Sequence, residues 1–301
     1  MNELSFDDRV VVVTGAGRGI GRAYAELLAA RGASVVVNDL GTSMGGRGTD
    51  VAPANEVVAQ IHDCGGVAVA DGNDVSRVEG AEALVATALE HFGRLDALIN
   101  NAGIMKWATM PEIDLDTLQR HLDVHLIGSF NTARAAWPHF VEQGRGRIVM
   151  TTSAGMLGHP ANLAYAAAKG GVVGLMRALA ASGRGHDIAV NAVAPAAETR
   201  MAGQATDSPP DSPMAPELVA PLVAYLCHDA CPVSGEIYAA GAGRFSRMVI
   251  ATTEGYLGGH DTTIDDIAQN WAAIDDTSTL SISADLLEWS AEFTRHLHAA
   301  D

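Results

Sequence analysis

Near-continuous apolar runs, rich in β-branched residues, alternate with Ala- and Leu-rich stretches over most of the chain. Such runs are typical of parallel strands that helices bury on both faces. Six of them lie at residues 10–14, 34–39, 67–70, 95–100, 147–152 and 188–195. A seventh, shorter strand is expected at 236–240, after a Ser-Gly turn. The sequence therefore predicts an α/β fold: a single-domain, Rossmann-like, doubly wound parallel sheet of about seven strands.

Three segments depart from this alternation. The Gly-rich stretch 40–50 and the Pro-rich stretch 201–216 are predicted to be mobile loops. From residue 246 the pattern changes to short polar helices, with Trp271 and Trp289 as apolar anchors and no further strand pattern. We interpret residues 1–245 as the main domain. Residues 246–301 are interpreted as a C-terminal helical extension that packs on the core or on a partner subunit.

Charge and cysteine content narrow the class of protein. With 36 acidic and 19 basic residues, the formal net charge is minus 17, which repels nucleic acid and anionic membrane, so neither is expected as a partner. The N-terminus does not resemble an export or transit signal, and a cytoplasmic location is expected. Three cysteines fit a reducing compartment. Cys227 and Cys231 lack zinc-site spacing, so we expect a buried helix face and no metal.

A Gly-rich turn follows the first predicted strand and opens a helix. The segment TGAGRGIG contains Gly15, Gly19 and Gly21. Glycines let the backbone approach a pyrophosphate, and a helix N-terminus offers N–H groups and a positive dipole end. The GxxxGxG spacing differs from the GxGxxG of most dinucleotide enzymes. The strand before it and the helix after it nevertheless predict a dinucleotide-binding loop, which makes residues 1–245 a dinucleotide-binding catalytic domain.

Asp39, at the end of the second predicted strand, bears on the choice of cofactor. A carboxylate there can hydrogen-bond the adenosine ribose and repels a 2′-phosphate, so NAD is the expected cofactor. Arg18 is an argument for NADP instead, because a basic side chain in the Gly loop could support a 2′-phosphate. It could equally pair with the pyrophosphate or with a nearby acid. We give Asp39 more weight, because desolvating two like charges is costly.

Two more turns are expected at the carboxyl edge of the sheet, where open α/β folds bind ligands. Asp74 and Val75 follow the third strand and would border the adenine. Asn101, Ala102 and Gly103 follow the fourth strand and would line the cofactor cleft. The alternative for each segment is an ordinary structural turn.

Tyr165 and Lys169 lie four residues apart, about one helical turn, so their side chains leave the same helix face. Lys169 is one of only two lysines in a chain that otherwise uses arginine. A fixed ammonium beside a phenol stabilises the phenolate. The pair is therefore predicted to be a general acid/base, against the alternative of two ordinary residues on an Ala-rich helix.

The motifs TGAGRGIG, NNAG, a serine at the end of the fifth strand and YAAAK resemble, in order and spacing, those of the short-chain dehydrogenase/reductase family. The strings VHLIGSF, APLVAYLCHDAC and AAGAGRFSR are similar to the (3R)-hydroxyacyl-CoA dehydrogenase units of peroxisomal multifunctional enzymes and their bacterial relatives. This resemblance covers nearly the whole chain. It implies NAD(H)-dependent interconversion of a secondary alcohol and a ketone, on a hydroxyacyl-CoA or a hydroxysteroid-like substrate.

The resemblance implies roles for individual residues. Tyr165 would be the general acid/base, Lys169 would lower its pKa and hold the nicotinamide ribose, and Ser153 would polarise the substrate oxygen. Thr152 holds the family's usual offset from the tyrosine. We favour Ser153, because a one-residue loop deletion is easier than a shift that exchanges the faces of a strand. His125 replaces an asparagine that holds a proton-relay water in most members; it could hold the same water or merely be packed on its helix.

The expected cofactor-binding set follows from the motifs and the resemblance together. Pro195-Ala196 stands where the family has Pro-Gly, and Thr199 could contact the nicotinamide carboxamide. The full set is Gly15, Arg18, Gly19, Ile20, Gly21, Asp39, Leu40, Asp74, Val75, Asn101, Ala102, Gly103, Tyr165, Lys169, Pro195, Ala196 and Thr199.

Two alternative functions stay open at this point: an NADPH-dependent 3-oxoacyl-thioester reductase, and a non-catalytic cofactor-sensing scaffold. The acidic charge opposes a CoA substrate, so Arg200, Arg244 and Arg247 would have to compensate. Small residues along the helix after Tyr165 allow close helix packing, and the family's members usually pair there. A homodimer or homotetramer is therefore expected.

Overall fold

The protein is described by a computed structural model that covers residues 3–199, 201 and 211–297. Arg200 and most of the predicted loop 201–216 lie outside the described residues. The chain divides into two compact units, the first ending at Arg247 and the second beginning at Met248. Each unit has its own sheet.

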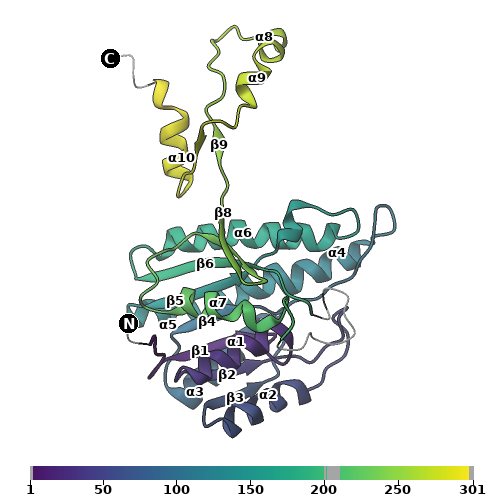
Figure 1. The fold of residues 1–301 in the computed structure, drawn as a ribbon, viewed down its shortest axis with the longest axis vertical. Helices are drawn as coiled ribbons and strands as arrows, with labels where there is room; N and C mark the ends of the chain where they lie inside the picture. The colour runs from purple at the N-terminus through teal and green to yellow at the C-terminus, as the bar shows by residue number, and fades with distance from the viewer. Residues whose placement is uncertain (1–2, 200, 202–210, 298–301) are drawn as a thin grey trace. The chain divides into compact units, whose positions relative to one another are not determined.

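The first unit is built on an eight-stranded sheet of order β3-β2-β1-β4-β5-β6-β7-β8 (Figure 1). The strands from β3 to β7 pair in parallel. Their bounds are β1 (Val10–Thr14), β2 (Ser34–Asn38), β3 (Val67–Asp71), β4 (Ala97–Asn100), β5 (Gly146–Thr151), β6 (Ile188–Pro195) and β7 (Ile237–Gly241). The direction of winding reverses between β1 and β4, which is where such sheets bind ligands. The predicted doubly wound parallel sheet is confirmed.

The eighth strand, β8 (Arg244–Met248), corrects the expected number of strands. Ala242 and Gly243 both have positive φ, 50° and 71°. This two-residue turn matches the tight turns that join antiparallel strands, so β8 folds back on β7. Four of its five residues are exposed. The segment therefore lacks the apolar pattern by which the other strands were predicted.

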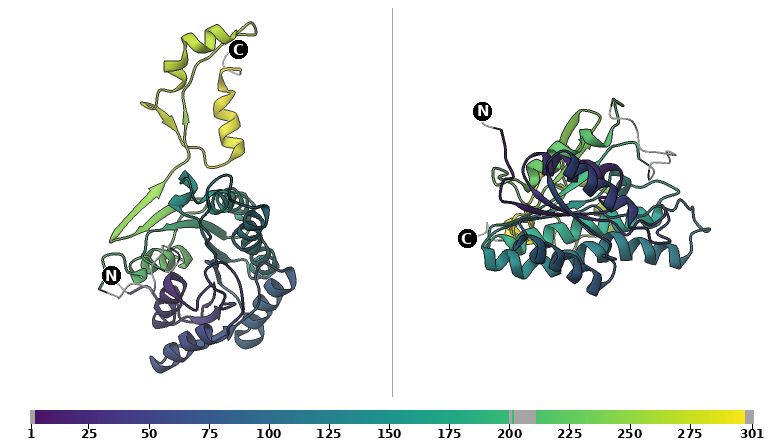
Figure 2. Two further views of the ribbon diagram at one scale, coloured as in Figure 1. Left: turned by 90° about the vertical axis from the view of Figure 1, so that its right-hand side faces the viewer. Right: turned by 90° about the horizontal axis from the view of Figure 1, so that it is seen from below.

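Helices cover both faces of the sheet (Figure 2). On one face α1 packs against α2 and α7, and on the other α3 packs against α5 and α4 against α6. The helices are α1 (Gly19–Ala30), α2 (Ala52–Asp63), α3 (Val78–Phe92), α4 (Leu115–His121), α5 (Gly128–Gln143), α6 (Leu163–Gly183) and α7 (Ala220–Cys227). A π-helix, η1 (Leu122–Ile127), joins α4 to α5, and short 3₁₀ turns lie at η2 (Ala154–Leu157) and η4 (Pro216–Leu218).

Helix α6 is the one described helix that is long and apolar enough to cross a membrane, judged by length and composition. Its inner face, which includes Ala168, Val172 and Met176, is buried. That face packs on β5 and β6. The apolar character of α6 is therefore that of a core helix.

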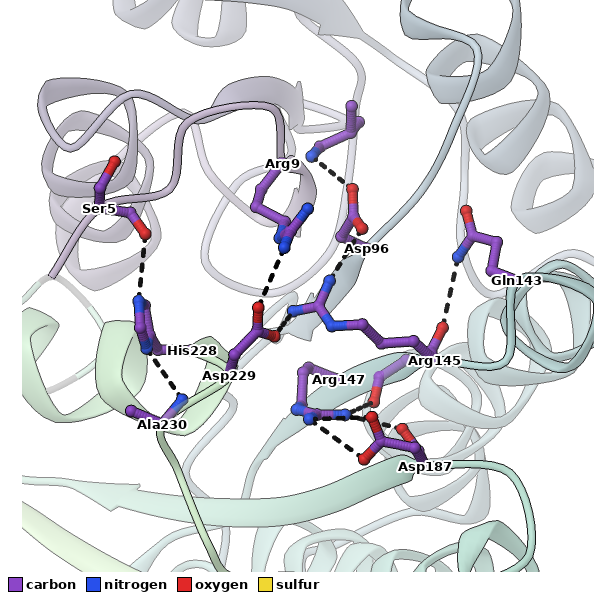
Figure 3. Close-up of polar contacts among 12 residues, drawn as sticks. Ser5, Arg9, Asp96, Gln143, Arg145, Arg147, Asp187, His228, Asp229 and Ala230 are labelled. Carbon is purple, nitrogen blue, oxygen red and sulfur yellow. Dashed lines mark hydrogen bonds and ion pairs between the residues drawn. The ribbon is translucent and has the colours of Figure 1, made fainter.

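An ionic network lies where β4 and β5 begin, at the edge of the sheet opposite to the carboxyl ends of the strands (Figure 3). The carboxylate of Asp96 is 2% exposed and pairs with Arg94 at 2.7 Å and with Arg145 at 2.9 Å. Arg145 also contacts Asp229, which pairs with Arg9 at 3.0 Å. The network joins the N-terminal segment, two strands and the residues after α7.

The second unit is small and has no buried residue among those described in it. Its elements are β9 (Thr252–Thr253) and β10 (Leu280–Ser281), which pair antiparallel, the helices α8 (Ile264–Gln269), α9 (Trp271–Ile274) and α10 (Leu286–Phe293), and the turn η5 (Arg295–Leu297). The two strands correct the expectation of helices only. Trp289 stacks on Phe293 with ring centroids 4.7 Å apart, while Trp271 is 58% exposed. The surface against which this extension packs stays a prediction.

Candidate active site

The turn between β1 and α1 forms a cradle that only glycine can line. Gly15 and Gly19 have left-handed φ of 63° and 55°. A β-carbon on Gly21 would lie 2.3 Å from the carbonyl oxygen of Gly15. The side-chain amide of Asn101 holds the turn by donating to the carbonyls of Thr14 and Gly15, each at 3.0 Å.

The start of α1 suits a phosphate group. Arg18 stands at the N-cap position and its side chain makes no capping hydrogen bond, and the first turn of the helix contains no acidic residue. An anion at this end would therefore meet main-chain N–H groups and the positive end of the helix dipole without a competing carboxylate. The cradle and the helix start together fit a dinucleotide pyrophosphate.

A cavity of about 350 Å³ opens over this cradle. It brings together most of the predicted cofactor-binding residues from five separate segments of the chain. Those that line it are Gly15, Arg18, Gly19, Ile20, Gly21, Asp39, Leu40, Asp74, Val75, Asn101, Ala102, Gly103 and Thr199. Tyr165, Lys169, Pro195 and Ala196 are not among the described residues of its wall.

Asp39 lies in the cavity wall with a fixed carboxylate. Its Oδ2 accepts from the main-chain N–H of Gly17 at 2.8 Å, and its Oδ1 accepts from that of Gly41 at 2.7 Å. Each oxygen keeps a second lone pair with which it could accept from a ribose hydroxyl. Arg18 lines the same cavity.

The other predicted segments lie around the same edge of the sheet. The Asp74 carboxylate accepts from the main-chain N–H of Ser76 at 2.9 Å, and the main-chain N–H of Ala102 donates to the Thr14 hydroxyl at 3.0 Å. Pro195 ends β6, and the next residue, Ala196, donates its N–H to the carbonyl of Ala240 at 2.8 Å.

Tyr165 and Lys169 share one face of α6, where Lys169 is buried and Tyr165 is half-buried. Lys169 is 3% exposed; its Nζ donates to the carbonyl of Thr151 at 2.6 Å and lies 5.6 Å from the centroid of the Tyr165 ring. Burial lowers the pKa of Lys169 to about 7. The predicted pair is therefore in contact and in a low-dielectric setting.

The direction of the Tyr165 pKa corrects the sequence-based expectation. Burial raises this pKa, and the hydrogen bond with Ser153 lowers it by less. The expected lowering by Lys169 does not dominate, because the phenol is desolvated and burial also lowers the pKa of Lys169 to about 7, which leaves its amine about half protonated near neutral pH. Additional positive charge beside the phenol would favour the phenolate.

The structure separates the two hydroxyls that were candidates for the substrate oxygen. Ser153 is the N-cap of η2, where its Oγ accepts from the N–H of Gly155 at 3.0 Å, and its side chain stands beside Tyr165, where it lowers the pKa of the phenol. Thr152 is buried and donates to the main-chain carbonyl of Lys169 at 2.8 Å. Only the serine side chain is beside the phenol with capacity for another partner.

His125 lies in the π-helix η1, a helix type that often marks functional sites. Its ring is 1% exposed and stands perpendicular to the Tyr165 ring, with centroids 5.2 Å apart. Its Nε2 lies 2.9 Å from the carbonyl and 3.2 Å from the N–H of Ile104, one contact for each neutral tautomer. Its Nδ1 is buried without a partner, beside Gly103 of the cavity wall. Burial lowers the pKa of His125 well below 6.5, so the ring is neutral.

His121 is a neighbour that the motifs did not identify. Its ring stacks on His125 with centroids 5.9 Å apart. Its Nδ1 contacts the carbonyl of Thr117 at 2.8 Å, and its Nε2 accepts from the N–H of Lys106 at 3.3 Å. These contacts define a neutral imidazole that holds the His125 ring in position. The i, i+4 spacing of the two histidines was the available signal.

Two expectations outside this site have structural outcomes. Arg247 pairs with Glu236 at 2.6 Å, which offsets the charge proposed to attract a CoA phosphate. Cys227 and Cys231 are both buried, but α7 ends at Cys227 and Cys231 lies after it, so the predicted helix face is correct for Cys227 alone. Across the described parts of the chain, no group of three or more His, Cys, Asp or Glu residues could hold a metal ion.

A family model described as short chain dehydrogenase matches residues 9–209. The chain is 43% identical, over 277 residues, to a short-chain type dehydrogenase/reductase of Mycobacterium tuberculosis, covering 92% of this chain and 97% of that protein. It is 41% identical, over 305 residues, to the mouse peroxisomal multifunctional enzyme type 2, covering 99% of this chain but 41% of that enzyme. The chain thus spans less than half of the length of the mouse enzyme.

Among solved structures, the full-length peroxisomal multifunctional enzyme type 2 of Drosophila melanogaster superposes with a TM-score of 0.80 at 32% identity. The match covers 98% of this chain and 50% of that one. The similarity therefore extends into the residues that form the second unit here.

Proposed function

The chain belongs to the short-chain dehydrogenase family, whose members are oxidoreductases acting on CH–OH groups, and on that premise we propose that it uses NAD(H) to interconvert a 3-hydroxyacyl-CoA and the corresponding 3-oxoacyl-CoA. The observation that carries the proposal is that Ser153 and Lys169 both interact with Tyr165, whose ring stands against that of His125, beside Gly103 of the cavity wall. Hydroxysteroid-like alcohols are the second substrate class to test.

In the direction of oxidation, the phenolate oxygen of Tyr165 takes the proton of the substrate hydroxyl. The Ser153 hydroxyl hydrogen-bonds the substrate oxygen and keeps it against Tyr165, and the Lys169 ammonium stabilises the phenolate and holds the nicotinamide ribose. NAD, when bound, supplies the hydride acceptor. His125 holds, through its unpartnered Nδ1, a water that carries the proton away from this site.

Asp39 supports NAD over NADP, because its fixed carboxylate would face the 2′-phosphate of NADP. We expect the wild-type chain to have a higher kcat/KM with NAD than with NADP. In Asp39→Asn the ratio of these two values should fall by about tenfold or more, because the like-charge repulsion is removed. Steady-state kcat/KM with each cofactor measures this. An intrinsic NADP preference above tenfold would instead favour the NADPH-dependent 3-oxoacyl-thioester reductase.

The substrate class is tested with a panel of 3-hydroxyacyl-CoA thioesters, their free-acid counterparts and hydroxysteroids. We expect the thioesters to give the highest kcat/KM. The exposed Arg244 is a candidate contact for the CoA phosphates, and Arg244→Gln should then raise KM for the thioesters without changing KM for the steroids. Turnover of steroids alone would reject the acyl-CoA assignment.

A non-catalytic, cofactor-sensing scaffold is the alternative of a different class. It predicts that Tyr165→Phe leaves every measured rate unchanged. The enzymatic assignment predicts that this variant still binds NADH, by fluorescence titration, but loses about 10²-fold or more in kcat. Intact cofactor binding in the variant separates lost chemistry from lost folding.

We propose that the chain works as a homodimer or homotetramer. Helix α5 exposes Phe130 and Val141, next to the exposed Ile127 at the end of η1, and helix α6 exposes Gly170 and Gly174. A second copy could therefore approach these helices closely. The second unit also needs a covering surface, because a unit of this size without buried residues cannot supply its own core. Sedimentation at micromolar concentration tests the assembly, and a monomer at that concentration would reject it.

A further inference from the structure

The segment from Leu40 to Asp50, here called the strap, is a compact Ω-shaped loop. Its two ends meet where the N–H of Asp50 donates to the carbonyl of Leu40 at 3.0 Å. Inside it, the N–H of Ser43 donates to the carbonyl of Arg47 at 2.8 Å. The strap, predicted as a mobile loop, therefore has hydrogen bonds that define one conformation.

The tip of the strap is attached to the segments that follow β4. The N–H of Met105 donates to the carbonyl of Met44 at 2.9 Å. The Arg120 side chain reaches from α4 and donates through Nη1 to the carbonyl of Gly45 at 3.3 Å. Gly46 lies against Ile104, since a β-carbon there would be 3.0 Å from the Ile104 Cγ2.

These attachments carry the strap over the cradle. In the sheet, β2 and β4 flank β1, and the glycine turn follows the carboxyl end of β1. A segment that leaves β2 and touches the residues after β4 must cross above that turn. Strap residues accordingly form part of the cavity wall: Leu40, Thr42, Ser43, Met44 and Gly46. Arg120 lines the same cavity.

We propose that the strap closes over a bound dinucleotide, that Arg120 is the latch that holds it shut, and that opening of the strap sets the rate of cofactor release. The proposal rests on the proposed function only in its choice of a dinucleotide as ligand. Arg120 suits the role because it lines the cavity, its guanidinium reaches the Gly45 carbonyl of the strap, and its Nε pairs at 3.1 Å with the exposed carboxylate of Asp116 on the same helix. It is a positioning residue, since its partner is the strap.

The first test measures the dissociation rate of NADH by stopped-flow fluorescence in Arg120→Gln. We expect the rate to rise about tenfold, the effect of losing a hydrogen bond from a charged donor. Arg31→Gln is the matched control. Arg31 also pairs with a carboxylate, Glu3, and approaches a carbonyl, that of Leu4, but at the surface and outside the cavity.

The second test loosens the strap without removing a charge. Gly46 and Gly48 have similar left-handed φ, 74° and 80°. A β-carbon added at Gly46 would meet Ile104, whereas one added at Gly48 would have no other atom within 4 Å. Gly46→Ala should therefore accelerate NADH release several-fold more than Gly48→Ala, because the two variants share the backbone strain and differ in the contact with Ile104.

Limited trypsin digestion supplies a readout that is independent of turnover. Arg47 is exposed at the strap, and mass spectrometry can follow cleavage after it. Saturating NADH should slow this cleavage several-fold in the wild type and in Arg31→Gln, and much less in Arg120→Gln. Proteolysis reports the population of the open strap when opening is fast relative to cleavage.

The outcomes separate the two levels of inference. If the wild type binds no dinucleotide, the proposed function is rejected together with the strap. If the wild type binds NADH but Arg120→Gln and Gly46→Ala release it no faster than their controls, the strap is rejected and the proposed function stands. If only Arg120→Gln is faster and strap cleavage is unchanged, Arg120 contacts the cofactor directly and does not act as a latch.

Discussion

The hydroxyl of Thr152 donates to the main-chain carbonyl of Lys169 at 2.8 Å. This bond ties the residue after β5 to the middle of α6, where the Lys169 side chain returns to the carbonyl of Thr151 at 2.6 Å. The end of the strand and the helix that carries the proposed acid/base are thereby held together from both sides. Ser153, the next residue, is left to face Tyr165.

This arrangement predicts opposite phenotypes for two adjacent hydroxyls. Ser153→Ala should lower kcat by about 10²-fold, since a donor to the reacting oxygen is lost, with little change in the free energy of unfolding. Thr152→Val should destabilise by about 0.5 to 1.5 kcal/mol, because a buried hydrogen bond to the carbonyl of Lys169 is lost, with a smaller change in kcat. Steady-state kinetics and urea unfolding measure both quantities. Equal loss of kcat in the two variants would contradict this division of roles.

His125 should act as a neutral residue. Its pKa is well below 6.5 because it is buried, so kcat should show no inflection from this residue between about pH 6.5 and 8. His125→Phe should lower kcat by about tenfold or more, since no ring nitrogen then meets the proposed water, whereas His125→Asn should retain most of the activity. NADH affinity is the control and should hardly change. Full activity of the Phe variant would show that His125 has only a packing role.

The buried Lys169 should make stability depend on pH. Its pKa is about 7 in the folded chain and near 10.5 when exposed, so between these values the unfolded chain binds more protons. The free energy of unfolding contributed by this group therefore increases as pH rises through that window. Lys169→Met removes the titration. The stability advantage of this variant over the wild type, up to a few kcal/mol below pH 7, should shrink toward pH 10.

Urea unfolding without cofactor at several pH values measures this difference. Lys106→Met is a suitable control, because it makes the same substitution at a lysine whose side chain is 47% exposed. A difference between Lys169→Met and the wild type that stays constant from pH 6 to 10 would show that the ammonium is not desolvated.

Removing Asp96 should damage stability and leave the chemistry intact. Its buried carboxylate accepts from the N–H of Val10 at 2.9 Å and pairs with Arg94 and Arg145. Asp96→Ala leaves these groups without their buried partner and should lower the free energy of unfolding by about 3 to 5 kcal/mol. Asp229→Asn, at a carboxylate that is 45% exposed, should cost about 0 to 1 kcal/mol. Activity per folded molecule should be unchanged, since the network lies at the opposite edge of the sheet from Tyr165.

Much of the fold could be predicted because its signals are local. Each central strand is a continuous apolar run, such as Val10–Thr14, and the runs are separated by helical patterns, so the parallel sheet follows from short-range periodicity. Strand β8 escaped prediction because it is exposed and depends on pairing with β7. The strands of the second unit were not predicted for the same reason, because β9 and β10 have two residues each and form only by pairing with each other.

The sequence by itself determined the glycine cradle, the position of Asp39 after β2 and the shared helix face of Tyr165 and Lys169, because each depends on spacing within one element. Tertiary structure decided which hydroxyl faces Tyr165, how burial moves the pKa values of Tyr165 and Lys169, and that His121 and Arg120 join the site. These features depend on which atoms from distant segments exclude water from one another. Periodicity within one segment carries no record of such contacts.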